Sequence, residues 1–421
     1  MKKTILPLCA ALLLTAGLVS CGNGDQPTTG TPTTPAATTP AAKETVYLTV
    51  WVPAEQVSWA EARIEEFKAA NPAKEYHVTV VNCAEGDVQA NIKNDPTAAA
   101  DVFLFAGDHL GPLVEGDYLY EWPSAFVEAL LTEIDESVLS SAMVDGKLYG
   151  IPYTPNSYFM YYNGDKVTLD ETKSLDTLLE KGKVLFDIDN GWYQTAFWYG
   201  TGVRFFGEDG TDPTVATLNT EQGYAAARAI RNYINNPNFI NGGDDEIKAD
   251  FKKESDYVAA IGGSWLSAEL LTEFGNSLQA TTLPTFVEGG NEYHLTATGD
   301  WKKAGVAKYT DSPTDAMNLA VWLTNADSML QKLEAFSETP ILKSLANNEA
   351  VTSNAIVSAL MTQTNTYCVR QPVITQMSNW WSAAENFAKE VIAAKDAGTP
   401  ISDADCIEWA NQLQSDLLKT I

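Results

Sequence analysis

The sequence predicts an α/β fold with two doubly wound domains. The chain has 421 residues, more than a single hydrophobic core usually serves, so two domains are expected. From the first apolar run onward, predicted strands over residues 46–51, 77–81 and 100–105 alternate with helical segments such as 58–70. This βα alternation favours a mainly parallel sheet with helices on both faces.

The stretch from residue 258 to residue 286 carries the clearest signals of the second half. It predicts a strand over 258–261, a turn at Gly262-Gly263, a helix that opens at Ser264-Trp265 and a second strand over 278–283. The apolar run does not alternate with polar residues, which is typical of a strand buried on both faces. Trp265 therefore follows the carboxyl end of a strand, the edge at which open α/β sheets bind ligands.

Composition and charge exclude several classes of function. The formal net charge of −28 argues against nucleic acid or an anionic membrane surface as a partner. The three histidines are scattered, and the chain has no phosphate-binding loop, zinc motif or nucleophile elbow. We therefore expect no catalytic residues, no metal and no cofactor. The acidic run Asp244-Asp245-Glu246 is interpreted as a solvated loop rather than a metal site.

The N-terminus has the pattern of a bacterial lipoprotein. Residues 1–20 combine two lysines with an apolar stretch too short to span a bilayer, as in a signal peptide. Leu18-Val19-Ser20-Cys21 resembles a lipobox, in which Cys21 receives the lipid. Residues 21–45, rich in Thr, Pro and Ala, predict a disordered tether. We expect attachment through this lipid alone to the outer face of the cell membrane, in a Gram-positive envelope.

The remaining cysteines form no recognisable framework. Cys83, Cys368 and Cys406 are widely spaced and fit neither a zinc pattern nor a set of disulfides. Unpaired buried thiols are the simpler interpretation, and a Cys368–Cys406 bridge remains an alternative.

Several motifs resemble one family. Gly263-Ser264-Trp265 and Leu283-Pro284-Thr285-Phe286 match a G-x-W turn and a strand ending of the family 1 extracellular solute-binding proteins of ABC importers. The hairpin over 144–152 and the segment Gln376–Trp381 match two further family motifs. The resemblance covers residues 46–421.

The resemblance implies a two-lobed, periplasmic-binding-protein-like fold of type II. Lobe 1 would comprise residues 46–154 and 298–350, and lobe 2 residues 155–297 and 351–421. Each lobe is discontinuous because the family's chain crosses between them three times, here near 152–163, 293–298 and 350–351. Three strands would then form the hinge.

The resemblance also implies a set of aromatic site residues. An indole laid against a sugar ring covers the ring's apolar C–H face and leaves the hydroxyl groups free for polar side chains. The stacking aromatics of the family's maltodextrin-binding members fall on four residues, and three further aromatics are candidates. The first set is Phe105, Trp192, Trp265 and Trp381, and the second is Trp380, Trp301 and Tyr153.

The polar positions follow the family less closely. Its acids are kept at Glu55 and Asp108, two others become Asn156 and Asn190, and neighbouring basic residues become Gln56 and His109. Carboxylates and amides both bond sugar hydroxyls, so a sugar ligand still fits. The particular sugar does not follow.

These expectations describe a monomeric binding protein. It would capture an oligosaccharide, with a malto-oligosaccharide favoured, by closing its lobes, and deliver it to the permease subunits of an ABC importer. A receptor for a cationic solute such as a polyamine, held by aromatic rings and carboxylates, is one alternative. A glycoside hydrolase with a hidden carboxylate pair is another. A surface role that captures polysaccharide without transport also stays open.

Overall fold

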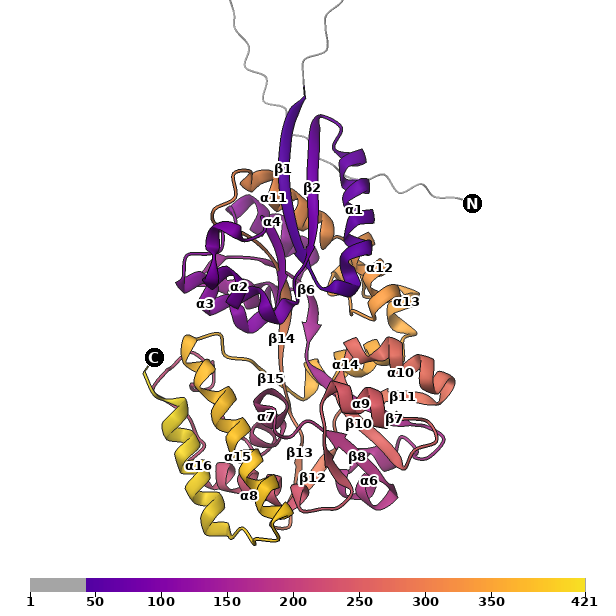
Figure 1. Cartoon of the computed structure of the whole chain (residues 1–421), viewed down its shortest axis with the longest axis vertical. Helices are drawn as coiled ribbons and strands as arrows, with labels where there is room; N and C mark the ends of the chain where they lie inside the picture. The colour runs from indigo at the N-terminus through magenta and orange to yellow at the C-terminus, as the bar shows by residue number, and fades with distance from the viewer. Residues whose placement is uncertain (1–42, 421) are drawn as a thin grey trace, which may run out of the picture. The chain divides into compact units, whose positions relative to one another are not determined.

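The computed structural model describes residues 43–420, and this part of the chain contains two large sheets (Figure 1). The first sheet has the order β15-β14-β3-β1-β2, with β6 also paired to β14. β1 runs parallel to β2 and β3, whereas β14 runs antiparallel to β3 and β6. Its strands are β1 (Glu44–Val52), β2 (Lys74–Asn82), β3 (Val102–Phe105), β6 (Ile151–Asn156), β14 (Ala297–Val306) and β15 (Cys368–Arg370).

The second sheet has the order β11-β7-β10-β8-β9. β10, β8 and β9 are parallel, and β7 runs antiparallel to both β10 and β11. Its strands are β7 (Tyr158–Asn163), β8 (Lys183–Phe186), β9 (Phe239–Asn241), β10 (Tyr257–Gly263) and β11 (Leu278–Thr281). Two small hairpins complete the strands, namely β4 (Met143–Val144) with β5 (Lys147–Leu148), and β12 (Thr285–Glu288) with β13 (Asn291–His294).

Helices cover both faces of each sheet. Around the first sheet lie α1 (Val57–Ala70), α2 (Val88–Asn94), α3 (Leu110–Glu115), α4 (Ser124–Glu133), α5 (Glu136–Leu139), α11 (Pro313–Leu323) and α12 (Ala326–Phe336). Around the second lie α6 (Leu175–Lys181), α7 (Gly191–Gly200), α8 (Glu221–Ile234), α9 (Asp244–Asp250), α10 (Ser267–Phe274), α13 (Glu349–Thr352), α14 (Ala355–Thr366), α15 (Ser378–Asp396) and α16 (Asp403–Leu417).

The side chains of β7 show why its sequence does not alternate. Tyr158 and Met160 belong to a core shared with α7, α8, α15 and α16, whereas Phe159 and Tyr161 belong to a core shared with α9, α10 and α14. A strand that contributes to two cores must be apolar on both faces. The predicted double coverage of the sheet is confirmed.

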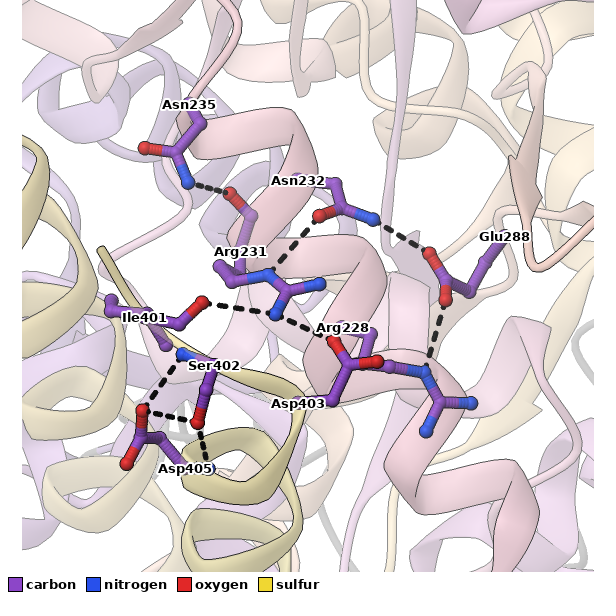
Figure 2. Close-up of polar contacts among 9 residues, drawn as sticks. All are labelled: Arg228, Arg231, Asn232, Asn235, Glu288, Ile401, Ser402, Asp403 and Asp405. Atoms are coloured by element: carbon purple, nitrogen blue, oxygen red, sulfur yellow. Dashed lines mark hydrogen bonds and ion pairs between the residues drawn. The ribbon is translucent and has the colours of Figure 1, made fainter.

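Helix α8 ties distant segments of the second core together (Figure 2). The Arg228 guanidinium lies 3.0 Å from the carboxylate of Glu288 on β12, to which Asn232 also donates. Arg231 donates to Asp403 at 2.8 Å, at the start of α16, and to a backbone carbonyl just before that helix. Through these contacts α8 joins β12 to the start of α16.

Two sequence predictions need correction. The tether was expected to reach residue 45, but β1 already begins at Glu44 and pairs with β2 from that residue. The third crossing was expected to be a strand, but Glu349–Thr352 form helix α13. The reason is local, because the side chain of Asn348 accepts a hydrogen bond from the backbone N–H of Ala350 and caps a helical turn.

The signal peptide, Cys21 and most of the predicted tether lie outside the described residues. Within residues 43–420, no helix has the length and apolar character needed to cross a membrane. Cys83, Cys368 and Cys406 are free thiols, as the simpler interpretation of the sequence expected. The lobe boundaries at 154/155, 297/298 and 350/351 stay a prediction.

Candidate functional site

A cavity of about 1170 Å³ opens where the carboxyl ends of strands from both sheets meet. The first sheet contributes the residues that follow β1, β2 and β3, and the second contributes those that follow β8 and β10 together with the starts of α7, α9 and α15. This is the edge at which open α/β sheets bind ligands. The polar and aromatic residues that line it are Glu55, Asn82, Glu85, Asp87, Asn91, Asp108, Asn156, Asp187, Asp189, Asn190, Trp192, Asp244, Trp265, Lys302, Gln371, Trp381 and Glu385.

Three tryptophans form the aromatic side of the cavity. Trp265 is 39% exposed, and its indole N–H donates to Asp244 Oδ2 at 2.7 Å. The Trp192 ring lies 6.2 Å from it at an angle of 36° and is held by a bond from its N–H to Gln371 Oε1 at 3.1 Å. Two open indoles are thus fixed in orientation before any ligand arrives, which lowers the entropic cost of binding.

Trp381 reaches the same cavity from helix α15. The start of α7 packs directly against this part of α15, where a Cβ atom on Gly191 would lie 3.0 Å from the carbonyl oxygen of Trp381. Only glycine permits that approach without a shift of the backbone. The side chain of Asn190 caps α7 by accepting from the Trp192 backbone N–H at 3.0 Å. This short turn therefore positions Trp192 and also brings the start of α7 against Trp381.

The opposite side of the cavity is built on a buried ion pair. Lys302 on β14 lies 2.5 Å from Glu85, whose other carboxylate oxygen accepts a hydrogen bond from the Tyr153 hydroxyl. Burial opposes ionisation of Glu85, but the Lys302 ammonium outweighs it and holds the pKa of Glu85 below its ordinary value. Glu85 is therefore a fixed anion.

A second layer of charge supports this pair. Lys332 lies 3.1 Å from Glu338 and 4.2 Å above the centre of the Tyr153 ring. Gln56 donates to Glu338 at 2.9 Å. These groups are nearly fully buried, and each charge has an opposite partner, which buried ions require. Gln56 thus supports the floor of the cavity and does not line it.

Three carboxylates stand beside the tryptophans. Burial, and then the neighbouring charge of Asp189, raise the pKa of Asp187 to about 7, although Asn190 donates to Asp187 at 3.1 Å. Burial also raises the pKa of Asp244, against the effect of the bond from Trp265. This side of the cavity is acidic and partly shielded from water.

The raised pKa of Asp187 predicts a pH-dependent contribution to stability. Its ordinary value is 3.8, so between about pH 4 and pH 7 the folded chain binds this proton more tightly than the unfolded chain does. The stabilisation of the folded chain by protonated Asp187 is fully present below this range and is lost as pH rises through about 7. We expect Asp187→Asn to flatten the decline in the unfolding midpoint over this range. Asp245→Asn, at an exposed position outside the cavity, should keep the parental slope, and an unchanged slope in Asp187→Asn would contradict the assignment.

The structure brings most of the sequence-predicted residues to this one cavity. Its lining includes Glu55, Asp108, Asn156, Asn190, Trp192, Trp265 and Trp381. Their contact with a ligand stays a prediction.

Other candidates do not line the cavity. Phe105 is fully buried because all four residues of β3 are, and its ring packs 5.8 Å from Phe103. Trp380 is also fully buried, with its ring 4.5 Å from that of Phe205. We predicted that the rings of Phe105 and Trp380 face the cavity. That prediction is wrong, because the hydrophobic core around each ring encloses it.

The two other weaker candidates are also displaced, and His109 is not part of the lining either. Tyr153 lies beneath Glu85 and is buried. Trp301, on β14, and His109, which is buried at the start of α3, are outside the lining.

Sequence reasoning missed the acidic residues beside the tryptophans. Asp187 and Asp189 follow directly after β8, and their position after a strand's carboxyl end was the available signal. Asp244 was assigned to a solvated loop, but it opens helix α9 and bonds Trp265. Gln371 and Glu385 carry no local signal, because only the fold brings their segments to the cavity.

Fold and cavity together define a two-lobed α/β binding protein of type II. The chain belongs to the bacterial extracellular solute-binding proteins, whose family model matches residues 62–359. It is therefore an extracytoplasmic solute-binding protein.

Named relatives support this assignment. The chain is 26% identical over 414 residues to the galactooligosaccharide-binding protein of Bacillus subtilis (strain 168), covering 94% of this chain and 93% of the relative. It is 25% identical to the maltodextrin-binding protein MdxE of the same organism, with 92% of each chain covered.

Solved structures share the fold. One, with acarbose, has a TM-score of 0.80 and 29% identity and covers 89% of this chain and 99% of its own. The maltodextrin-binding protein MalE1 from L. casei BL23, without ligand, also has a TM-score of 0.80 at 20% identity, covering 89% of this chain and all of its own. The second likeness concerns the fold alone.

Proposed function

We propose that this protein captures an oligosaccharide for an ABC importer, with a malto-oligosaccharide as the favoured ligand. The observation that carries the proposal is the set of three tryptophans, Trp192, Trp265 and Trp381, beside carboxylates and amides in one open cavity. Indoles cover the apolar faces of sugar rings, and the polar groups accept from the hydroxyls. The relatives named for oligosaccharide and maltodextrin binding support the same class of ligand.

Binding is proposed to proceed by closure of the two lobes. The tryptophans come from elements around the second sheet, whereas Glu55, Glu85 and Asp108 follow strands of the first. A sugar that contacts both sets favours the closed arrangement over the open one, and the permease subunits would recognise that arrangement. The ligand is bound and released unchanged, so no catalytic residue, metal or cofactor is assigned.

The protein is proposed to act as a monomer held at the outer face of the cell membrane. The lipid on Cys21 and the tether up to β1 would allow the body to reach its permease. Residues 46–154 with 298–350 and residues 155–297 with 351–421 would be the two lobes that move.

Intrinsic fluorescence tests the ligand class. We expect the purified full chain to give a saturable change with malto-oligosaccharides of increasing length, and affinity to rise until all three tryptophans are covered. Trp381→Ala should weaken binding of the longer sugars by at least about tenfold, since each stacked ring contributes about 2–3 kcal/mol. Absence of any response to neutral or charged oligosaccharides would overturn the proposal. Release of new reducing ends from the sugars would instead indicate the hydrolase alternative.

A further inference from the structure

The cavity carries negative charge that the protein does not neutralise. Eight carboxylates line it, but Glu85 pairs with Lys302 at 2.5 Å, and Glu385 pairs with Lys389 at 2.7 Å. No cationic side chain in residues 43–420 lies within ion-pair distance of the other six, which are Glu55, Asp87, Asp108, Asp187, Asp189 and Asp244. Lys302 is the only lysine or arginine among the lining residues in this part of the chain.

Half of these unpaired carboxylates gather around the indoles. Asp244 accepts from the Trp265 N–H at 2.7 Å, and Asp187 and Asp189 precede Trp192 by a few residues at the start of α7. The Trp192 and Trp265 rings are tilted 36° to each other at 6.2 Å. Acidic groups and open aromatic faces thus occupy the same part of the cavity.

A buried hydroxyl of the core residue next to Trp192 also lacks a partner. Tyr193 is 5% exposed, its ring lies 5.1 Å from that of Trp192, and its hydroxyl bonds no other group in the described part of the chain. Burial, and then the charges of Asp244 and Asp187, raise its pKa well above the ordinary value. The side chain therefore lies in the field of both carboxylates, although Tyr193 is not itself among the lining residues of the cavity.

With a neutral sugar, only proton uptake by the carboxylates, chiefly by Asp187 with its pKa of about 7, would relieve this charge. Closing the cavity removes water and strengthens the repulsion among the carboxylates. A protonated amine would relieve that repulsion, and indole faces also attract cations. Hydroxyl groups of a neutral ring can accept or donate hydrogen bonds, but they cannot cancel the charge.

We propose that the part of the cavity formed by Trp192, Trp265, Asp187, Asp189 and Asp244 is a subsite for a sugar unit that carries a protonated amino group. The inference rests on the proposed function, because it names the class of oligosaccharide that the same cavity prefers. The remaining units of the chain would stack on Trp381 and reach the first sheet as neutral sugars do.

Three matched sugars test the subsite by fluorescence titration at neutral pH. They are maltotetraose, the same tetrasaccharide with the primary hydroxyl of one terminal unit replaced by an amino group, and the N-acetylated form of that amine. Either end can be the one that enters the subsite, so both terminal isomers are used. We expect one amino isomer to bind about tenfold more tightly than the other two sugars. Its advantage should shrink as salt rises from about 10 mM to about 150 mM, because screening shortens from about 30 Å to about 8 Å.

Two double variants separate this subsite from the overall charge. Asp187→Asn/Asp189→Asn should reduce the advantage of the amine over maltotetraose, with both sugars measured on this variant, to less than about twofold. Asp245→Asn/Asp250→Asn removes the same charge from exposed positions on α9 outside the cavity and should keep the advantage. A cooperative unfolding transition shows that each variant is folded.

Each other outcome has a distinct meaning. Equal binding of the amine and the neutral sugars by the parent protein overturns the subsite and leaves the proposed function intact. An advantage that persists in Asp187→Asn/Asp189→Asn overturns its location. Binding of spermidine without binding of any sugar overturns the proposed oligosaccharide ligand itself, in favour of a receptor for cationic solutes.

Discussion

Asp300→Ala is expected to lower the free energy of unfolding by about 3–5 kcal/mol. Asp300 and Lys303 form an ion pair on β14 at 2.9 Å, with side chains 2% and 0% exposed. The backbone of Gly107 packs closely against this carboxylate, because a Cβ atom on Gly107 would lie 1.8 Å from Asp300 Oδ2. Removing Asp300 therefore leaves the Lys303 ammonium buried without its counter-charge.

The pH dependence of the Asp300→Ala variant provides a check on the cause. Burial already holds the pKa of Lys303 below its ordinary value, and the attraction of Asp300 opposes that shift. Removing Asp300 lowers the pKa of Lys303 in the folded chain further below its value in the unfolded chain. The free energy of unfolding of the variant should therefore recover as pH rises toward about 10. Chemical denaturation at several pH values measures both the loss and the recovery.

Two controls isolate the buried charge. Asp300→Leu/Lys303→Met removes both charges and should be markedly more stable than Asp300→Ala. Asp170→Ala breaks an exposed pair with Lys173 and should cause no measurable change. If Asp300→Ala unfolds at the parental denaturant concentration, the pair does not have the structural importance assigned here.

Trp265→Ala is expected to weaken oligosaccharide binding by about 30- to 100-fold. A sugar ring that covers on the order of 100 Å² of indole contributes about 2–3 kcal/mol, which the alanine variant loses. The ring is 39% exposed and fixed by Asp244, so the loss should appear in affinity rather than in the unfolding midpoint.

Trp409 offers a matched control for this substitution. Its indole N–H also donates to a carboxylate, Glu390, at 3.0 Å, but it lies on α16 and does not line the cavity. Isothermal titration of Trp265→Ala and Trp409→Ala should show a large loss only in the first. Equal affinities for the two folded variants would remove Trp265 from the binding site.

Secondary structure and the edge that binds ligand could be predicted locally. The unbroken apolar run of β10 and the apolar face of α1 predict a covered sheet and a helix, because local burial patterns decide both. Trp265 was predicted to lie at a strand's carboxyl end, and it lines the cavity. Asn348 shows the opposite case, in which a single capping side chain made a helix where the resemblance implied a strand.

The orientation of individual side chains depended on tertiary packing. Trp380 and Trp381 are neighbours on α15, yet the first is enclosed by Trp198 and Phe205 and the second reaches the cavity. Both residues are tryptophans, so they differ only in their position relative to the face of α15 that packs against α7. Phe105 is turned inward in the same way by the core between β3 and its helices.

The sequence by itself determined that this chain forms covered α/β sheets, because the length and spacing of apolar runs fix which segments must be buried. It also determined that aromatic residues follow their strand ends. The tertiary structure alone decided that Asp187, Asp244 and Gln371 meet those aromatics. These contacts join residues far apart in the chain, and their geometry arises only when the helices pack on the two sheets.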